Sequence, residues 1–173
     1  MATATQLSID EYLATTYRPD CDYVDGELQE RNLGKRDHSD IQRILVGILY
    51  AKEYEWNVVG LPEQRLRVGP TRVRIPDVCI LSIDAPTEQI VTSAPLACIE
   101  ILSEGDTLQT TRPRLIDYAN LGVANIWVFD SQLQQAFIWT PDAPARPAEI
   151  LAIPNTPVAI DVPAVFTRFA QRR

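Results

Sequence analysis

Hydrophobic residues change their spacing along the chain, and these changes predict helices and strands in alternation. Between Ile41 and Leu49 apolar residues recur every three or four positions, which is typical of a helix with one buried face. Asp37 or Ser39 is available to cap the first turn of this helix. From Trp56 onward the pattern becomes strand-like, and it predicts strands over residues 56–59, 64–68 and 73–81.

The middle of the chain predicts a strand, a helix and a second strand in a parallel crossover. Residues 96–102 (LACIEIL) are apolar at every position but one, as expected of a central strand that is buried on both faces. Thr111 can cap the following helix, which Gly122 would end, and residues 125–129 form the next strand. A strand that follows a helix in this order pairs in parallel with its predecessor. One more strand is predicted over residues 134–139.

The two ends of the chain add smaller elements to this centre. Ser8 and Glu11 have the spacing of a capping box and predict a short helix over residues 9–15. The pair Asp25-Gly26 predicts a tight hairpin between two short strands. Residues 141–163 contain six of the 13 prolines, which favours edge strands and turns, and Asp161 can cap a last short helix.

Composition favours one soluble globular domain spanning residues 1–173. The chain is 46% hydrophobic and 23% charged, which is ordinary for a globular protein and excludes extensive disorder. No apolar run approaches the roughly 20 residues that span a bilayer, and the N-terminal segment carries acids where a signal peptide carries lysines. We therefore expect a cytoplasmic protein without a membrane segment.

The charge balance limits how the protein could bind nucleic acid. A net charge of −7 excludes attraction through bulk positive charge, so any contact with phosphate needs a local group of cations. The nearly alternating arginines between positions 65 and 74 could place several guanidinium groups on one face of a strand pair. The alternative is that they form an ordinary solvated hairpin face; the residues concerned are Arg65, Arg67, Arg72 and Arg74.

Two carboxylates interrupt the most apolar strands of the sequence, Asp77 in RIPDVCILS and Glu100 in LACIEILS. A buried acid is costly unless a cation or hydrogen-bond donors compensate it. If the two strands are neighbours, the acids share one space, and a divalent cation such as Mg²⁺ would turn their repulsion into affinity. The alternative is that each acid is solvated or paired with an arginine. Cys79 and Cys98, two residues from these acids, are expected to be small apolar neighbours rather than ligands.

The order of these motifs resembles a known nuclease pattern. Pro76-Asp77, 22 intervening residues and Glu100-Ile101-Leu102 resemble the PD-(D/E)XK motif. Together with DYVDGEL, His38 at the start of the long helix, PDVCIL, IEILS, IDYANLGV and NIWVFD, they resemble the Uma-type family of restriction-endonuclease-like proteins from about Ser8 to Asp130. The resemblance implies an α/β fold, with a restriction-endonuclease-like mixed β-sheet core flanked by helices and an N-terminal hairpin and helix added to it.

The resemblance also implies a chemistry and a set of site residues. It implies a Mg²⁺-dependent (or Mn²⁺-dependent) endonuclease, acting on DNA as a homodimer, with metal ligands at Asp77, Glu100 and the carbonyl of Ile101. The superfamily lysine is replaced by Leu102, and the matching place on the following helix is Arg114. An arginine can hold phosphate, but it is a poor proton acceptor.

Two further residues are weaker candidates for the site. Glu27 lies in the DGEL hairpin, which the resemblance places near the metal, although a hairpin glutamate can equally be a surface residue. His38 could be a general base or a phosphate ligand, or only a local group at a helix start. Arg112 points about 200° away from Arg114 around the helix, so at most one of the two should face the site.

Three functions are compatible with this sequence. The first is the DNA endonuclease. The second is a catalytically impaired member of the same fold that serves as a DNA- or protein-binding module, because Arg114 replaces the lysine. The third is a metal-dependent hydrolase of nucleotides, which the acidic net charge favours slightly.

Overall fold

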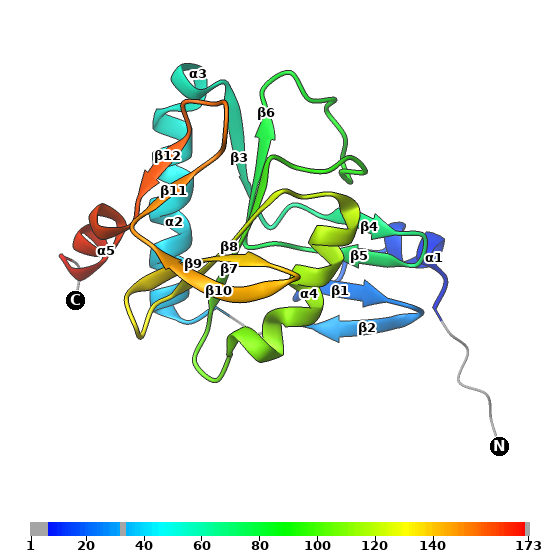
Figure 1. Ribbon diagram of the computed structural model, residues 1–173. Helices are drawn as coiled ribbons and strands as arrows, with labels where there is room; N and C mark the ends of the chain where they lie inside the picture. Colours follow the sequence, from blue (N-terminus) through cyan, green and yellow to red (C-terminus); the bar gives the residue numbers. More distant parts are fainter. Residues whose placement is uncertain (1–6, 32–33, 172–173) are drawn as a thin grey trace.

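A six-stranded mixed sheet forms the centre of the computed structural model, which describes residues 7–31 and 34–171 (Figure 1). Its strand order is β10-β9-β8-β7-β6-β3. Only β7 and β8 pair in parallel, and α4 connects them, so the predicted crossover is confirmed. The bounds are β3 (Val58–Pro62), β6 (Val78–Ser82), β7 (Ala97–Leu102), α4 (Leu108–Leu121), β8 (Asn125–Asp130), β9 (Gln135–Thr140) and β10 (Ala143–Ala148).

Helices cover both faces of this sheet. Alternate side chains of β6, β7 and β8 pack on one face against α2 (Arg36–Ala51) and α5 (Val162–Ala170). The other side chains of the same strands pack against α4 and the strand β4 (Leu66–Gly69). A Cβ atom on Gly60 would lie 2.6 Å from Cβ of Leu49, so this glycine lets β3 approach α2 closely. Both layers of the core are thus set by the period-two pattern of the central strands.

A second sheet of four strands lies beside the first, with order β2-β1-β5-β4. The ring of Tyr12 from the N-terminal helix α1 is fully buried there and stacks on Tyr23 of β1, with ring centroids 5.0 Å apart. A two-stranded ribbon of β11 and β12 precedes α5 at the opposite end of the molecule (Figure 1). The remaining bounds are α1 (Ile9–Leu13), β1 (Cys21–Val24), β2 (Glu27–Glu30), α3 (Glu53–Trp56), β5 (Arg72–Arg74), β11 (Ile150–Ala152) and β12 (Ala159–Asp161).

The structure corrects the prediction of one strand over residues 73–81. This segment is two strands in two different sheets, with a break at Ile75-Pro76-Asp77. Pro76 has no backbone N–H to donate to a ladder, and the N–H of Ile75 donates instead to the carboxylate of Asp22, at 3.1 Å. The break matters for function because it carries Asp77 out of the regular strand.

Among the other differences from the expected boundaries, three concern where helices begin or end. Trp56 ends the short helix α3 and does not begin a strand. Helix α2 begins after Lys35, earlier than Asp37 or Ser39 would allow, and Lys35 makes no side-chain cap bond. Helix α4 is capped by Thr107 instead of Thr111.

Other expectations hold. The capping box of α1, the hairpin at Asp25-Gly26, Gly122 in the left-handed conformation that ends α4, and Asp161 at the start of α5 are all confirmed. The proline-rich segment forms the sheet edge β10 and the small ribbon, as its composition indicated. Within residues 7–31 and 34–171, the structure contains no helix with the length and apolar character that a membrane crossing requires.

Candidate functional site

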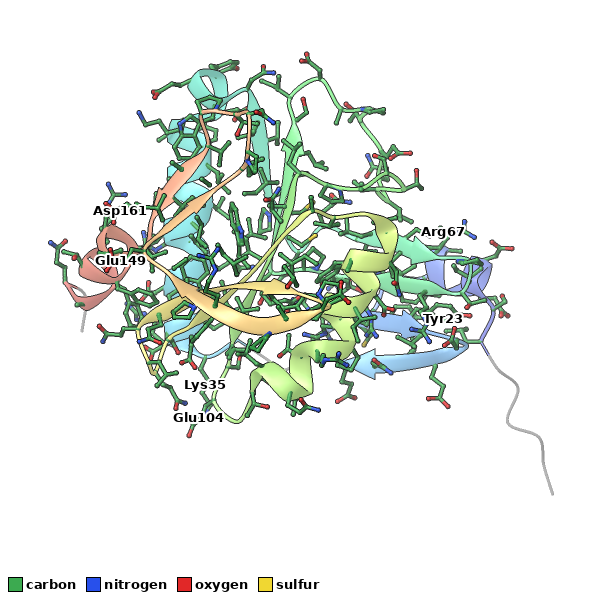
Figure 2. All side chains as sticks on the ribbon, in the orientation of Figure 1. Tyr23, Lys35, Arg67, Glu104, Glu149 and Asp161 are labelled. Atoms are coloured by element: carbon green, nitrogen blue, oxygen red, sulfur yellow. The ribbon has the colours of Figure 1, made fainter. Side chains whose placement is uncertain are left out.

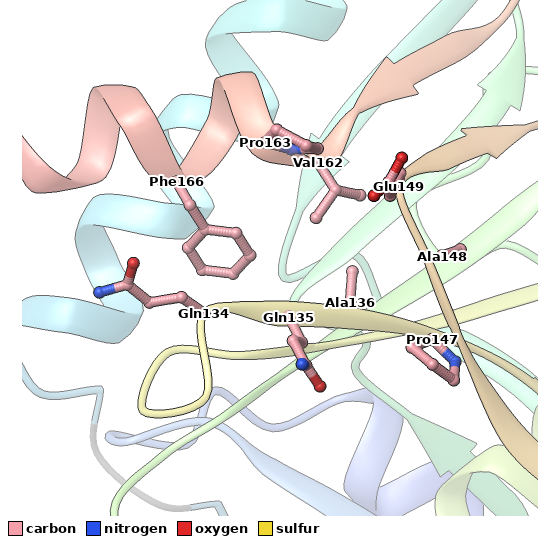
Figure 3. A pocket seen from close by; sticks show the side chains of 9 residues that line it. All are labelled: Gln134, Gln135, Ala136, Pro147, Ala148, Glu149, Val162, Pro163 and Phe166. Atoms are coloured by element: carbon pink, nitrogen blue, oxygen red, sulfur yellow. The ribbon is translucent and has the colours of Figure 1, made fainter.

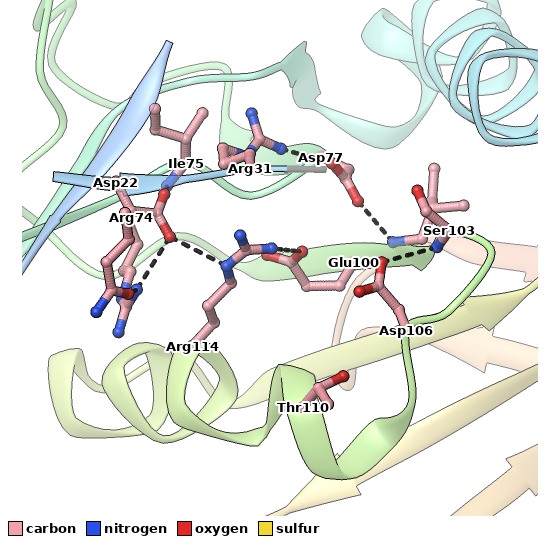
Figure 4. Close-up of polar contacts among 12 residues, drawn as sticks. Asp22, Arg31, Arg74, Ile75, Asp77, Glu100, Ser103, Asp106, Thr110 and Arg114 are labelled. Atoms are coloured by element: carbon pink, nitrogen blue, oxygen red, sulfur yellow. Dashed lines mark hydrogen bonds and ion pairs between the residues drawn. The ribbon is translucent and has the colours of Figure 1, made fainter. Parts of the chain in front are cut away.

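The two acids that interrupt the apolar strands come together in the structure. Strands β6 and β7 are antiparallel neighbours, with Val78 opposite Ile99, so Asp77 lies next to Glu100. Oδ2 of Asp77 accepts a hydrogen bond from the N–H of Ile101, at 2.7 Å, which joins the two segments (Figure 4). Asp77 is 3% exposed and Glu100 2% exposed. The predicted convergence of two buried carboxylates is therefore observed.

Asp77 is held by two positively charged or ionisable side chains. Nη2 of Arg31 lies 2.6 Å from Oδ1, and Nε2 of His38 lies 3.1 Å from Oδ2. Burial alone would raise the pKa of Asp77, but His38, Arg31 and the Ile101 N–H outweigh it and hold the pKa below its ordinary value. Burial would likewise lower the pKa of His38, and the hydrogen bond and charge of Asp77 raise it instead. Asp77 therefore keeps its negative charge at neutral pH.

At Glu100 the effects that raise the pKa outweigh those that lower it. Its Oε1 accepts a hydrogen bond from the hydroxyl of Tyr118, at 2.5 Å, and its Oε2 lies 3.4 Å from Nη1 of Arg114. Burial, followed by the charge of Asp77, raises the pKa of Glu100 to about 7. The two acids thus titrate far apart, which is the behaviour of like charges that share one desolvated space.

Arg114 is fixed by a carboxylate from the other sheet. Its Nε donates to Oδ2 of Asp22, at 3.0 Å, and the same oxygen lies 3.0 Å from Nη1 of Arg74. Burial lowers the pKa of Arg114, but Glu100 and Asp22 outweigh this effect and raise it, so the guanidinium stays charged. Asp22 itself is fully buried on β1, between the two arginines (Figure 4). It anchors the guanidinium of Arg114 beside Glu100.

The arginines of the strand pair do not form a solvated face. Arg74 is only 3% exposed, and its Nε lies 2.7 Å from Oδ2 of Asp117 on α4. Arg72 lies 2.9 Å from the other oxygen of Asp117, and Arg65 pairs with Asp20 at 2.5 Å. The pairs with Asp117 tie the second sheet to α4, and the arginines are engaged in ion pairs instead of forming an ordinary solvated hairpin face.

Most of the predicted site residues converge, and one does not. Asp77, Glu100, the backbone of Ile101, His38 and Arg114 lie in one connected group. Glu27 lies exposed on the hairpin, opposite Val24 in the ladder and outside this connected group, and its role in the site stays a prediction. Arg112 is exposed on α4, as the helical geometry required.

Two residues of this group were missed by the sequence analysis, Asp22 and Arg31. Asp22 lies in the DYVDGEL motif, where a polar residue in a buried strand position was the available signal. Arg31 follows β2 in a segment whose pattern gave no such signal. Tyr118 of α4 also joins the group: it is fully buried and donates its hydroxyl to Glu100.

Comparisons with known proteins agree with the geometry. The model of the Uma2 family, described as "Putative restriction endonuclease", matches residues 9–167. The chain belongs to the Uma2 family. A similar solved structure is the crystal structure of "a putative nuclease belonging to DUF820" from Anabaena variabilis ATCC 29413, with a TM-score of 0.79. Its sequence is 18% identical, and the match covers 94% of this chain and 99% of that one. No curated protein matches the chain.

These matches confirm the expected fold, a mixed sheet flanked by helices, and they place the chain among restriction-endonuclease-like nucleases. In this Uma2-family chain the two acids thus lie within a nuclease-like fold. The family also implies a nucleic acid as substrate.

The donor set of this Uma2-family site fits a hard divalent cation. Mg²⁺ is commonly bound by one or two carboxylates that are completed by water and substrate phosphate, not by an all-protein cage. Asp77 and Glu100 supply two carboxylates, and each oxygen that accepts a hydrogen bond has a further lone pair. Within the described ranges, no three His, Cys, Asp or Glu side chains gather as a metal-binding group. Cys79 and Cys98 are free and buried, as expected of apolar neighbours.

Two pockets open onto the site. One of about 300 Å³ is lined by Asp77, Arg31 and His38, and another of about 210 Å³ by Arg114 and Arg74. A surface ion pair between Lys35 and Glu104 joins the start of α2 to the loop after β7 (Figure 2). Asp77 lines the first pocket, and Arg114, which contacts Glu100, lines the second, so guanidinium groups line both pockets.

A cavity elsewhere in the molecule has a different character. It measures about 500 Å³ and lies between β9, β10 and α5, lined in part by Gln135, Pro147 and Phe166 (Figure 3). Glu149 is the single carboxylate in its lining. It does not contain the pair of acids that a metal-dependent hydrolysis would use.

Proposed function

We propose that this protein is a Mg²⁺- or Mn²⁺-dependent endonuclease that hydrolyses phosphodiester bonds of DNA. The observation that carries the proposal is the convergence of Asp77 and Glu100 with Arg114 in one buried group. Divalent metals are the general cofactors of restriction-endonuclease-like proteins. Asp77, Glu100 and the carbonyl of Ile101 would hold the ion.

Each side chain has a part in this chemistry. A bound divalent ion supplies a water of lowered pKa and a positive charge against the phosphate. Arg114, held by Asp22, stabilises the negative charge that develops on the phosphate oxygens. Because its guanidinium stays protonated, it cannot accept the proton of the attacking water. His38, whose Nδ1 has no hydrogen-bond partner within the described residues, is the group with a nitrogen available for that proton.

A binding module without catalysis is the second candidate function. Two observations favour it: Arg114 stands where a lysine is expected, and an arginine already contacts each acid. Such a module would bind DNA without cutting it. Both candidates use the same fold, so only the reaction separates them.

The test is cleavage of supercoiled plasmid in Mg²⁺ or Mn²⁺. We expect nicking by the wild type, and a loss of at least about a hundredfold in Asp77→Asn and Glu100→Gln, which remove a ligand charge. Glu53→Gln, which changes a partly exposed acid on α3 outside the site, serves as the matched control. Plasmid binding without metal-dependent cleavage would show the binding module instead.

Arg114→Lys restores the lysine that the family pattern has at this place and tests its role. A lysine at this place can lose its proton, so we expect a higher turnover than in the wild type. Equal or lower turnover would show that Arg114 acts as a cation only.

We also propose that the active form is a homodimer. Cleavage of both strands of a duplex suits two active sites related by a two-fold axis. Light scattering coupled to size-exclusion chromatography should give twice the mass of one chain, and a monomer that cuts both strands would contradict this.

A further inference from the structure

Two residues that line the pocket beside Asp77 each have a buried nitrogen atom that lacks a partner among the described residues. Nε of Arg31 and Nδ1 of His38 make no hydrogen bond within residues 7–31 and 34–171. Both side chains are nearly covered, at 12% and 9% exposure. Buried polar atoms are nearly always satisfied, and Nε of Arg31 can only donate, so this atom indicates a ligand with an acceptor oxygen.

The acids near these nitrogens do not satisfy them. Asp20 lines the same pocket, but both of its oxygens accept bonds from Arg65, at 2.5 and 3.0 Å. Glu63, the other acid in the lining besides Asp77, is exposed. A Cβ atom on Gly34 would lie 2.9 Å from Nδ1 of His38, so the glycine leaves room for the ring.

The volume of the pocket also suits a ligand of some size. It measures about 300 Å³, and one water molecule takes about 30 Å³ of liquid, so a phosphate group with its ester oxygens can enter. Arg31 and His38 contact Asp77 and line this pocket, whereas Arg114 contacts Glu100 and lines the other pocket. The pocket is therefore a second position for an anion, separate from the one at Arg114.

A divalent cation bound at Asp77 would compete with Arg31 for a carboxylate oxygen. Its Nη2 donates to Oδ1 of Asp77, one of the proposed ligand oxygens. A guanidinium and a divalent cation repel each other at such a separation, so the ion gains affinity when Arg31 turns away. A guanidinium has five N–H donors in a planar fork that matches a phosphate, so a phosphate that enters the pocket can replace Asp77 as the partner of Arg31.

We propose that this pocket is a subsite for a phosphate of the DNA backbone, and that Arg31 is the residue that binds it. Arg31 neutralises Asp77 until the metal binds, and it then pairs with the phosphate. His38 lines the same pocket beside Asp77. This inference rests on the proposed nuclease function and adds a substrate-binding residue to it.

Arg31→Gln should strengthen the binding of Mn²⁺ and weaken the binding of DNA. Without DNA, Mn²⁺ should bind about tenfold more tightly, because a positive charge next to Asp77 is removed. With DNA, KM for a labelled duplex should rise roughly ten- to a hundredfold, because a charged hydrogen bond to phosphate is lost. The slope of log(1/KM) against log salt should shrink by about one. Mn²⁺ binding is followed by electron paramagnetic resonance, and KM by gel-based cleavage of the duplex.

Two variants serve as controls. Arg168→Gln removes an equal charge from the exposed face of α5, on the far side of the molecule, and should change none of these values. Arg31→Lys keeps the charge but not the planar fork, so Mn²⁺ affinity should stay near the wild-type value while KM rises by a smaller factor. If Arg31→Gln does not fold, an unchanged KM in Arg31→Lys overturns the proposal.

The outcomes separate this inference from the function on which it rests. A wild-type protein that cleaves DNA, with an Arg31→Gln variant that matches Arg168→Gln in KM or binds Mn²⁺ more weakly, overturns the phosphate subsite alone. A wild-type protein that neither binds Mn²⁺ nor cleaves DNA overturns the nuclease function, and the subsite with it.

Discussion

Replacing Glu100 by glutamine should stabilise the metal-free protein at alkaline pH and have little effect at acidic pH. The carboxyl group of Glu100 is buried beside Asp77, and both effects raise its pKa to about 7. A neutral amide of the same shape removes the charge that this place disfavours. Tyr118 can still donate its hydroxyl to the amide oxygen, so the local hydrogen bond is retained.

The sign and the size of the effect follow from linkage. Between its usual pKa of 4.5 and its folded pKa of about 7, Glu100 binds more protons in the folded state than in the unfolded one. Its contribution to stability is therefore complete below pH 4.5 and falls as the pH rises through 7, in total by about 3 kcal/mol. The pKa of His38 is also raised, so its contribution to stability decreases in the upper part of this pH range, in the wild type and in Glu100→Gln alike. Asp77, with a lowered pKa, is charged in both states there and adds no slope.

The measurement is urea denaturation with a chelator at about pH 5 and about pH 8. Relative to the wild type, Glu100→Gln should gain about 2 to 3 kcal/mol between the two pH values. Glu53→Gln, a change at a partly exposed acid outside the site, should gain nothing in the same comparison. A difference between Glu100→Gln and the wild type that is the same at both pH values would refute the raised pKa of Glu100, and with it the argument for two acids in one desolvated space.

Three further substitutions test the packing and the charges around the site. Asp22→Asn removes the charge that holds two arginines, and it should lower the free energy of unfolding by about 3 to 5 kcal/mol in chemical denaturation. Tyr118→Phe removes a hydrogen-bond donor from Glu100 and should lower the free energy of unfolding by about 1 to 2 kcal/mol. The loss should be larger at pH 8 than at pH 5, because a charged carboxylate needs the donor more than a neutral carboxyl group does. An equal loss at both pH values would contradict this. Gly60→Ala places a methyl group against Leu49 and should lower the unfolding temperature, at a cost of about 1 to 3 kcal/mol; an unchanged temperature would show that β3 and α2 can separate freely.

The sequence predicts the elements whose signals are local. The strand that contains Glu100 is apolar on both faces, and Gly122 ends the next helix, so the parallel crossover is evident without a structure. The pair Asp77 and Glu100 is equally evident, because two charges in apolar strands require compensation. These inferences depend only on residues near one another in the chain.

The partners that hold the acids depend on contacts between distant segments. Asp22 and Arg114 are 92 positions apart, and Arg31 and Asp77 are 46 apart. No periodicity predicts which arginine meets which acid, since each contact arises where the second sheet packs beside the first. The arginines of residues 65–74 were misread for the same reason: their alternation is real, but Asp20 and Asp117, which bind three of them, come from other elements.

The arginines also explain how the fold tolerates its buried acids before any ion binds. The carboxylates of Asp77, Glu100 and Asp22 are contacted by three guanidinium groups, those of Arg31, Arg114 and Arg74, so the group is close to neutral. A divalent ion adds positive charge to this balanced set, and a DNA phosphate adds negative charge. Under the proposed function each therefore strengthens the binding of the other, by the same factor in both directions. An acidic protein can in this way bind an acidic polymer through a few placed charges and one ion, without a basic surface.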